Sequence, residues 1–149
     1  MASLIGEYGC KLDAKGRFLL PSGLKKQLPE NQQSDFVVNR GFESYLVLYP
    51  IPVWEAEMER LQGLNQYVKR NRDFVRRFLN GAQPVSLDGN GRMLIPKRLM
   101  DYAGLKKEMI LIAQIDRVEI WDKDAYDKWM DSMDEDDMGG MAEDVLGGE

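Results

Sequence analysis

The chain contains one ten-residue stretch twice, first as Leu12-Asp13-Ala14-Lys15-Gly16-Arg17-Phe18-Leu19-Leu20-Pro21 and again as Leu87-Asp88-Gly89-Asn90-Gly91-Arg92-Met93-Leu94-Ile95-Pro96. Each copy runs apolar residue, Asp, two turn residues, Gly, Arg, three apolar residues and Pro. Asp at the start of a four-residue turn can accept hydrogen bonds from backbone N–H groups of the turn. Gly in the fourth place supplies the positive φ of a type I turn with a G1 bulge. We therefore predict a β-hairpin at each copy.

An Arg follows the turn in both copies, at Arg17 and Arg92. Ordinary hairpin chemistry explains the Asp and the Gly without any function. It does not explain the Arg, because the start of a strand tolerates many residue types. The repeated Arg is therefore a candidate functional residue.

The composition indicates a globular protein without membrane spans. At 149 residues, the chain can form one domain or two small ones with a hydrophobic core. No apolar run approaches the roughly 18 residues of a membrane span, and the N-terminus lacks the basic start and apolar core of an export signal. A lone Cys10 excludes an internal disulfide and fits a reducing cytoplasm.

Histidine is absent from the sequence, which weighs against catalysis. Its absence removes the commonest general base and the commonest transition-metal ligand. With only one Cys as well, a structural zinc site is close to excluded. No acidic pair stands out from a solvated surface. We therefore expect a non-enzymatic protein that uses no cofactor, metal or small-molecule substrate.

The charge is distributed unevenly along the chain. Residues 131–149 contain eight acids and no Lys or Arg, although the whole chain carries a net charge of only −5. The remaining residues, 1–130, therefore carry +3. The low isoelectric point belongs to the tail, and the folded part is mildly basic.

The two halves of the chain are predicted to have the same order of elements. Each has two strands around the repeated turn, a short helix, a second hairpin and a further helix. The second hairpins have strands at 36–40 and 45–49 and at 109–113 and 118–121. The further helices begin near residue 53 and after Asp122, a plausible N-cap. Tyr49 and Trp121, at matching strand ends, are expected in the core. Since neither half is large enough to bury its own sheet face, we expect them to pair into one β-barrel-like body with pseudo-twofold symmetry.

A connector and a tail are predicted outside this repeat. Residues 65–81 read as a connector helix with no counterpart in the second half, and five cations lie on one side of it. That side is an ordinary solvated face, a subunit interface or a contact with phosphates, and the sequence leaves the three open. Residues 131–149 are too poor in apolar side chains to pack, so we predict an acidic disordered tail. The predicted units are thus 1–64 and 82–130 as the two halves, 65–81 as the connector and 131–149 as the tail.

The order of motifs along the chain resembles the MraZ family of bacterial regulators of the division and cell-wall gene cluster. The resemblance covers about residues 5–130, and the tail lies outside it. It is carried by Gly6-Glu7-Tyr8, Leu12-Asp13 with Lys15-Gly16-Arg17, Arg40-Gly41, Leu48-Tyr49-Pro50, Trp54, Phe78-Leu79 with Gly81-Ala82, Leu87-Asp88 with Gly91-Arg92 and Leu94-Ile95-Pro96, Tyr102-Ala103-Gly104-Leu105, and Ile120-Trp121.

The resemblance implies an α+β fold similar to the AbrB-like swapped-hairpin β-barrels, with two pseudo-symmetric β-β-α-β-β halves and connecting helices. It implies that D-x-x-x-R, at Asp13/Arg17 and Asp88/Arg92, is the DNA-binding element. It also implies assembly into rings of several subunits in the cytoplasm, associated with the nucleoid. Family members repress, and in some settings activate, transcription by binding short G-rich direct repeats ahead of their own operon.

The residues themselves agree with DNA binding. A two-stranded ribbon fits the major groove, and Arg can contact guanine O6 and N7 or a phosphate. We expect Asp to pair with the Arg guanidinium across each turn. Since the first copy carries two Lys and the second an uncharged turn tip, we expect the first to dominate. The candidate DNA-binding residues are Lys11, Asp13, Lys15, Arg17, Asp88, Asn90 and Arg92.

Two other classes compete with this reading. AbrB-like barrels also serve as antitoxins that bind a partner protein, but those usually have one barrel half and a long partner-binding tail. An enzyme on a small β-barrel is disfavoured by the missing His and by the lack of clustered carboxylates or a glycine-rich phosphate loop. Binding to double-stranded DNA would separate a regulator from both.

Overall fold

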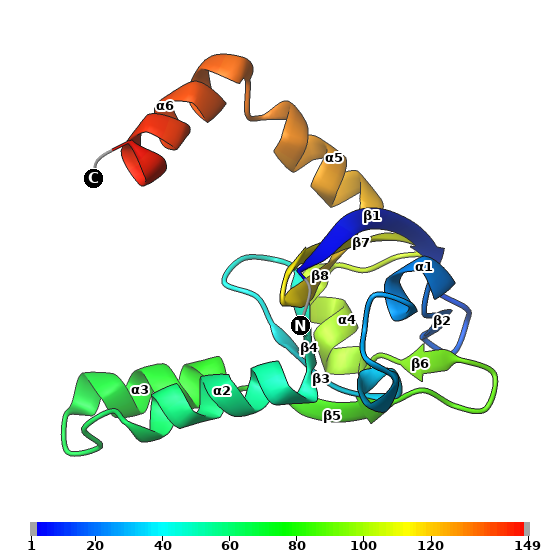
Figure 1. Cartoon of the computed structure of the whole chain (residues 1–149), viewed down its shortest axis with the longest axis horizontal. Helices are drawn as coiled ribbons and strands as arrows, with labels where there is room; N and C mark the ends of the chain where they lie inside the picture. The colour runs from blue at the N-terminus through cyan, green and yellow to red at the C-terminus, as the bar shows by residue number, and fades with distance from the viewer. Residues whose placement is uncertain (1–2, 148–149) are drawn as a thin grey trace.

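A computed structural model describes residues 3–147, and it consists of a sheet body from which two helical arms project (Figure 1). The predicted ends of the first half (1–2) and of the tail (148–149) lie outside the described residues. The strands are β1 Leu4–Lys11, β2 Arg17–Leu19, β3 Asp35–Arg40, β4 Leu46–Pro50, β5 Gln83–Ser86, β6 Arg92–Leu94, β7 Glu108–Ile115 and β8 Arg117–Asp122. The helices are α1 Ser22–Lys25, α2 Ile51–Gln62, α3 Lys69–Phe78, α4 Lys97–Ala103, α5 Lys123–Asp131 and α6 Glu135–Leu146, with a 3-10 turn at Glu30–Gln32.

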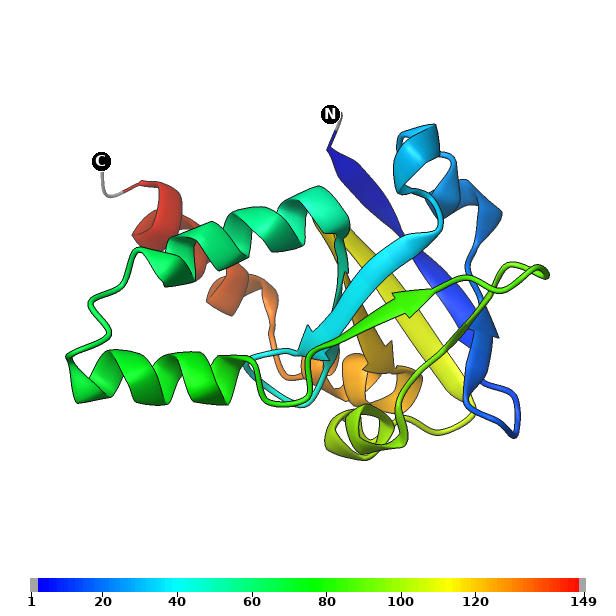
Figure 2. The ribbon, with the colours of Figure 1, turned by 90° about the horizontal axis from the view of Figure 1, so that it is seen from below.

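The strands of the two halves are interleaved. Six antiparallel strands form one sheet in the order β1-β7-β8-β4-β3-β5, and β2 and β6 form a separate two-stranded ribbon. Only the β3–β4 and β7–β8 hairpins, both predicted, pair strands of the same half. The other ladders join β1 to β7, β5 to β3, β4 to β8 and β2 to β6. Figure 2 shows β5 passing from the second half to the edge of β3. Neither half therefore has a complete sheet of its own.

The prediction of a closed hairpin at each repeated motif is wrong beyond the turn. β1 and β2 flank the first turn, yet β1 pairs with β7 and β2 with β6. The ribbon register places Phe18 opposite Met93, and each side chain is only 1% exposed. Exchange between the copies thus buries both side chains in one shared core.

The strands do not close into the predicted barrel; the fold is mixed α+β around an antiparallel sheet. β1 and β5 are the edges of the six-stranded sheet. On the β1 edge, the Gln27 side chain accepts from Ile5 N at 3.0 Å and donates to Ile5 O at 2.8 Å. A side chain from the loop after α1 therefore satisfies backbone groups that a further strand would otherwise bind.

The main core lies between the six-stranded sheet, the ribbon and the short helices α1 and α4. Side chains of both halves meet in it, among them Leu24 of α1, Leu99 of α4 and Leu111 of β7, all at most 1% exposed. Pro21 and Pro96 end the ribbon strands and precede the two helices, as their missing N–H and fixed φ favour. The ribbon is thus fixed to the body from behind by buried side chains.

A second, aromatic cluster supports the longer helices. Tyr49 and Trp121 are buried in it, as predicted, and Trp54 of α2 and Tyr126 of α5 pack against it. The rings of Tyr45 and Trp121 stack with centroids 4.9 Å apart. Asp122 is the N-cap of α5, as predicted, since its side chain accepts from Ala125 N at 3.2 Å. This cluster anchors the starts of both helical arms.

The first arm is a helical hairpin made of the helix predicted after residue 53 and the helix of the predicted connector. α2 runs outward from the sheet and α3 returns beside it (Figures 1 and 2). The helix within the predicted connector (65–81) is confined to Lys69–Phe78, because residues 65–68 form the bend after α2. No helix in the part of the chain that the structure describes is long and apolar enough to cross a membrane.

The second arm contains a helix where we predicted disorder. α6 begins with a capping box, in which the Asp134 side chain accepts from Asp137 N at 2.8 Å and the Asp137 side chain accepts from Asp134 N at 3.1 Å. Acidic residues in the first turn also suit the positive end of the helix dipole. Low apolar content argued for disorder, but local capping and charge favour a helix without a core.

Candidate nucleic-acid interface

The first turn is held together by the carboxylate of Asp13. Its Oδ1 accepts from the backbone N of Lys15 and from that of Arg17, both at 2.9 Å. The backbone closes the turn through Gly16 N to Asp13 O at 3.0 Å, and Gly16 has the predicted positive φ of 83°. The predicted turn chemistry is therefore confirmed at the first copy.

The second turn repeats this geometry. Asp88 Oδ1 accepts from Asn90 N at 2.8 Å and from Arg92 N at 3.0 Å. Gly91 N donates to Asp88 O at 3.0 Å, and Gly91 has φ of 75°. The difference in sequence at the turn tips therefore leaves the backbone of the turn unchanged.

The expected pairing of each Asp with its Arg guanidinium is not present. The carboxylates bind backbone N–H groups instead, and within residues 3–147 no ion pair includes Arg17 or Arg92. A short Asp side chain at the start of a turn lies close to the turn's own amides, which makes this arrangement the local one. Both guanidinium groups thus remain available to a ligand.

The two turns lie against each other's strands. Ile95 N, after β6, donates to Gly16 O at 2.9 Å, and Leu20 N, after β2, donates to Gly91 O at 3.1 Å. A Cβ at Gly16 would also lie 3.0 Å from the Met100 side chain of α4. The turns are therefore positioned by the opposite half of the chain, and each depends on the other.

The ribbon presents both arginines on one face. In the antiparallel register, Arg17 lies opposite Leu94, and Leu19 lies opposite Arg92. Directly opposed residues share a face, so these four side chains point away from buried Phe18 and Met93. Leu19 and Leu94 are 55% and 51% exposed. These leucines were not predicted as part of the site, because apolar residues after a turn are expected in the core until the ribbon register is known.

One surface depression of about 290 Å³ brings together six of the seven candidate residues. It is lined by Lys11, Leu12, Asp13, Arg17, Phe18, Leu19, Asp88, Asn90 and Arg92. The seventh, Lys15, is exposed at the tip of the first turn. Residues 75 positions apart in the chain thus form a single site.

The pKa of each Asp carboxylate is influenced by both arginines. The Arg17 backbone N–H, the Lys15 backbone N–H and the charges of Arg17 and Arg92 hold the pKa of Asp13 below its ordinary value. The pKa of Asp88 is lowered in the same way, first by the backbone N–H of Arg92 and also by both guanidinium charges. Each turn therefore lies in the positive field of both copies.

The surroundings of the first copy are richer in lysine. Lys11 pairs in register with Glu108, which brings it beside the loop before β7. A neighbouring depression of about 300 Å³ is lined by Lys11, Lys106, Lys107, Glu108, Asp122, Lys123 and Asp124. The three additional lysines were missed, because they approach Lys11 only through the β1–β7 pairing between the halves.

Neither of two kinds of chemical site, a metal-binding cluster and a reactive thiol, is found among the described residues. No group of three or more Cys, Asp or Glu within residues 3–147 is arranged to hold a metal ion. Burial raises the pKa of Cys10 to about 11, so its thiol is protonated at neutral pH and is a poor nucleophile.

Comparison with known sequences matches both halves of the chain. A family model described as "MraZ protein, putative antitoxin-like" matches residues 4–77 and again residues 78–146. The likeness therefore reaches beyond residue 130, the predicted limit of the resemblance. The second match includes α6, which occupies the place in its unit that α3 occupies in the first.

Similar proteins cover nearly the whole chain. The protein named transcriptional regulator MraZ of Christiangramia forsetii is 49% identical over 148 residues, which are 99% of this chain and 95% of the relative. The protein of the same name in Flavobacterium psychrophilum is 42% identical over 99% of this chain and 94% of its own length. That of Clostridium acetobutylicum is 39% identical over 93% of this chain and 94% of its own length.

Proposed function

The chain belongs to the MraZ family, and from this premise we propose that it is a transcriptional regulator that binds double-stranded DNA through its two turn motifs. One observation carries the proposal. The β2–β6 register puts Arg17 and Arg92 on the same face of the ribbon. They are diagonal neighbours, for which the Cα atoms are roughly 7–8 Å apart. Two guanidinium groups on a two-stranded ribbon, neither of them ion-paired within residues 3–147, are suited to the edges of neighbouring base pairs.

The ribbon face suits the major groove. A two-stranded β-ribbon fits its width, and Arg there can donate two hydrogen bonds to guanine O6 and N7. Leu19 and Leu94, between the arginines, can make apolar contact with thymine methyl groups. Lys11 and Lys15 lie at the rim of the first copy, where they would contact phosphates and fix the register of the protein on the duplex.

The proposal extends to the finer properties of the family. The interleaved ladders support a swapped-hairpin arrangement of the two halves, with the β2–β6 ribbon as the element that enters DNA. We infer a regulator of the division and cell-wall gene cluster that acts at the nucleoid, in the cytoplasm, on G-rich direct repeats at its own promoter. Several copies in a ring would present several ribbons to repeated sites and gain affinity through effective concentration.

A second candidate is an antitoxin-like protein that binds a partner protein, and the printed description of the family favours it. Exposed Leu19 and Leu94 would then be part of a protein interface. The two arginines weigh against it, since their positive field serves a phosphate polymer better than an apolar partner.

A gel-shift titration across salt concentrations tests the proposal. We expect the full chain to bind a duplex of G-rich direct repeats more tightly than a scrambled duplex, with log K falling by about 0.9 per log unit of salt for each phosphate contact. An Arg17→Ala/Arg92→Ala variant should lose this preference, and Arg70→Ala/Arg77→Ala is its matched control, since it removes two arginines from α3 and leaves the ribbon intact. Absence of binding to any duplex at low salt, with capture of a protein partner, would support the antitoxin-like reading instead.

A further inference from the structure

We propose that α6 of one copy docks into the groove between α2 and α3 of a second copy. The inference deepens the proposed function, because it rests on the assembly of several copies and names the surfaces that join them. It does not depend on DNA binding, so the two can fail separately.

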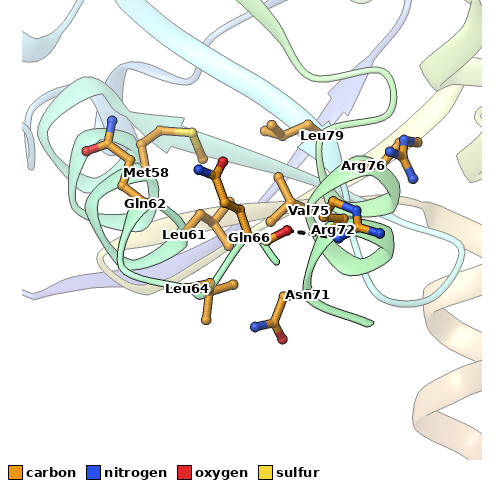
Figure 3. Close-up of a pocket in the computed structure, with 10 residues that line it drawn as sticks. All are labelled: Met58, Leu61, Gln62, Leu64, Gln66, Asn71, Arg72, Val75, Arg76 and Leu79. Atoms are coloured by element: carbon orange, nitrogen blue, oxygen red, sulfur yellow. Dashed lines mark hydrogen bonds between the residues drawn. The ribbon is translucent and has the colours of Figure 1, made fainter. Parts of the chain in front are cut away.

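The groove between α2 and α3 has a volume of about 700 Å³. Figure 3 shows Met58 and Leu61 of α2 facing Val75 and Leu79 on the side of α3, with Leu64 at the closed end. None of the side chains of α2 or α3 is buried. The groove between α2 and α3 therefore has an apolar floor, formed by these side chains, that the two helices do not bury.

The rim of the groove is positively charged. Arg72 and Arg76 line it, and α3 as a whole carries five cations against the single acid Asp73. Asp73 is shared by Lys69 at 2.6 Å and Arg76 at 3.2 Å. Most of the positive charge of α3 is thus uncompensated by described residues, and the groove favours an acidic amphipathic occupant.

Helix α6 has the complementary character. Met138, Met141 and Val145 follow a three- and four-residue spacing that puts them on one side of the helix, and they are 60%, 42% and 73% exposed. The helix contains five acids and no Lys or Arg. An apolar stripe flanked by acids matches an apolar floor flanked by arginines.

The repeat within the chain explains why α6 lacks a partner. In the first unit, α3 folds back beside α2, whereas in the second unit α6 continues away from α5 (Figure 1). The chain between α5 and α6 is short: Met133 N still donates to Met130 O at 3.2 Å after the end of α5, and α6 begins with the capping box at Asp134. Since α6 lies away from the α2–α3 hairpin of its own chain (Figure 1), the occupant is a second copy.

Each copy then offers one groove and one α6, which are different surfaces. Such a contact is heterologous, and it continues from copy to copy until the chain of subunits closes. Both surfaces lie on the helical arms, far from the ribbon, so docking leaves the DNA-binding face of every copy open.

Light scattering without DNA tests the inference with paired variants. The groove variant is Arg72→Glu/Arg76→Glu, and its control Arg70→Glu/Arg77→Glu makes the same charge change at residues that do not line the groove. The helix variant is Glu135→Lys/Asp144→Lys, each position three residues from the stripe. Its control, Asp136→Lys/Glu143→Lys, makes the same charge change on the opposite side of α6.

We expect the wild type and both controls to have a mass of several chains, and the groove and helix variants to fall to the single-chain mass of 17.1 kDa. Mixing the two monomeric variants should restore a complex that contains both, because the groove variant supplies a native α6 and the helix variant a native groove. Circular dichroism checks that every variant keeps its fold.

Several results would overturn the inference: a monomeric wild type, equal losses in a variant and its control, loss in only one of the two variants, or no complex on mixing. A groove variant that keeps its mass but loses DNA binding would instead make α3 a phosphate contact. An Arg17→Ala/Arg92→Ala variant should keep the full assembly mass, which separates this inference from DNA binding.

Discussion

At the scale of single residues, the Asp and the Arg of each repeated motif have different roles: Asp stabilises the turn, and Arg is available to a ligand. Asp13 and Asp88 bind the backbone of the turn, and the arginines stay free of ion pairs within the described residues. The predicted hydrogen bonds from the turn amides to each Asp are confirmed, whereas the predicted ion pairs with the Arg guanidinium groups are not seen within residues 3–147. The sequence pattern allowed both, and the short Asp side chain lies closest to the amides of its own turn.

Arg17 and Arg92 should contribute unequally to binding. The first copy has Lys11 and Lys15 beside its Arg, whereas the second turn carries uncharged Asn90. Arg17→Ala should therefore cost about 1–3 kcal/mol of binding free energy per engaged guanine contact, and Arg92→Ala should cost less per chain. Fluorescence anisotropy on one duplex, with Arg60→Ala as the control, measures both. An equal or larger loss for Arg92→Ala would reverse the order of the copies.

The first turn should lose order in acid, and Asp13 sets the pH. Because its pKa is depressed in the folded chain, the stabilisation is present above the ordinary value of 3.8 and is lost as the pH falls through the lower folded value. The amide signals of Lys15 and Arg17, followed by NMR, should shift with a midpoint below 3.8. Asp13→Asn should abolish that transition. A midpoint at or above 3.8 would contradict the hydrogen bonds assigned to this carboxylate.

At the scale of elements, the ribbon is a rigid platform because one face of it is core. Phe18 is 1% exposed and Leu19 is 55% exposed, although they are neighbours of similar apolar character. Phe18→Ala should lower the free energy of unfolding by about 3–5 kcal/mol, and Leu19→Ala should change it by less than about 0.5 kcal/mol. Urea unfolding measures the pair. Similar losses at the two positions would contradict the register of β2 against β6.

The sequence predicted elements better than their partners. The hairpins at β3–β4 and β7–β8, the cap at Asp122 and the burial of Tyr49 and Trp121 are confirmed, since short-range periodicity and capping determine them. The exchange of β2 and β6 was missed, because local turn chemistry is identical in a closed hairpin and in an exchanged one. Helix α6 was missed because the prediction of disorder rested on the low apolar content of residues 131–149 and did not use the capping box at Asp134. The depression shared by the two turns could not be predicted, because it forms only when β2 and β6 of the two halves pair.

At the scale of the whole molecule, the interleaved ladders make the two halves one folding unit. β1 lies against β7 and β5 against β3, so removing either half leaves unpaired strands. We expect one cooperative unfolding transition, with tryptophan fluorescence and far-ultraviolet circular dichroism changing together. Two separate transitions within the sheet body would show that each half is stable alone, and would contradict this pairing.

The central claim is that the two turn motifs form one DNA-binding surface, and selection of bound duplexes from a random pool tests it most directly. We expect the wild-type chain to enrich a G-containing motif that recurs at a fixed spacing. The Arg17→Ala/Arg92→Ala variant, folded and with unchanged assembly mass, should enrich no motif. If the variant recovers the same motif as the wild type, the ribbon face is not the surface that reads DNA.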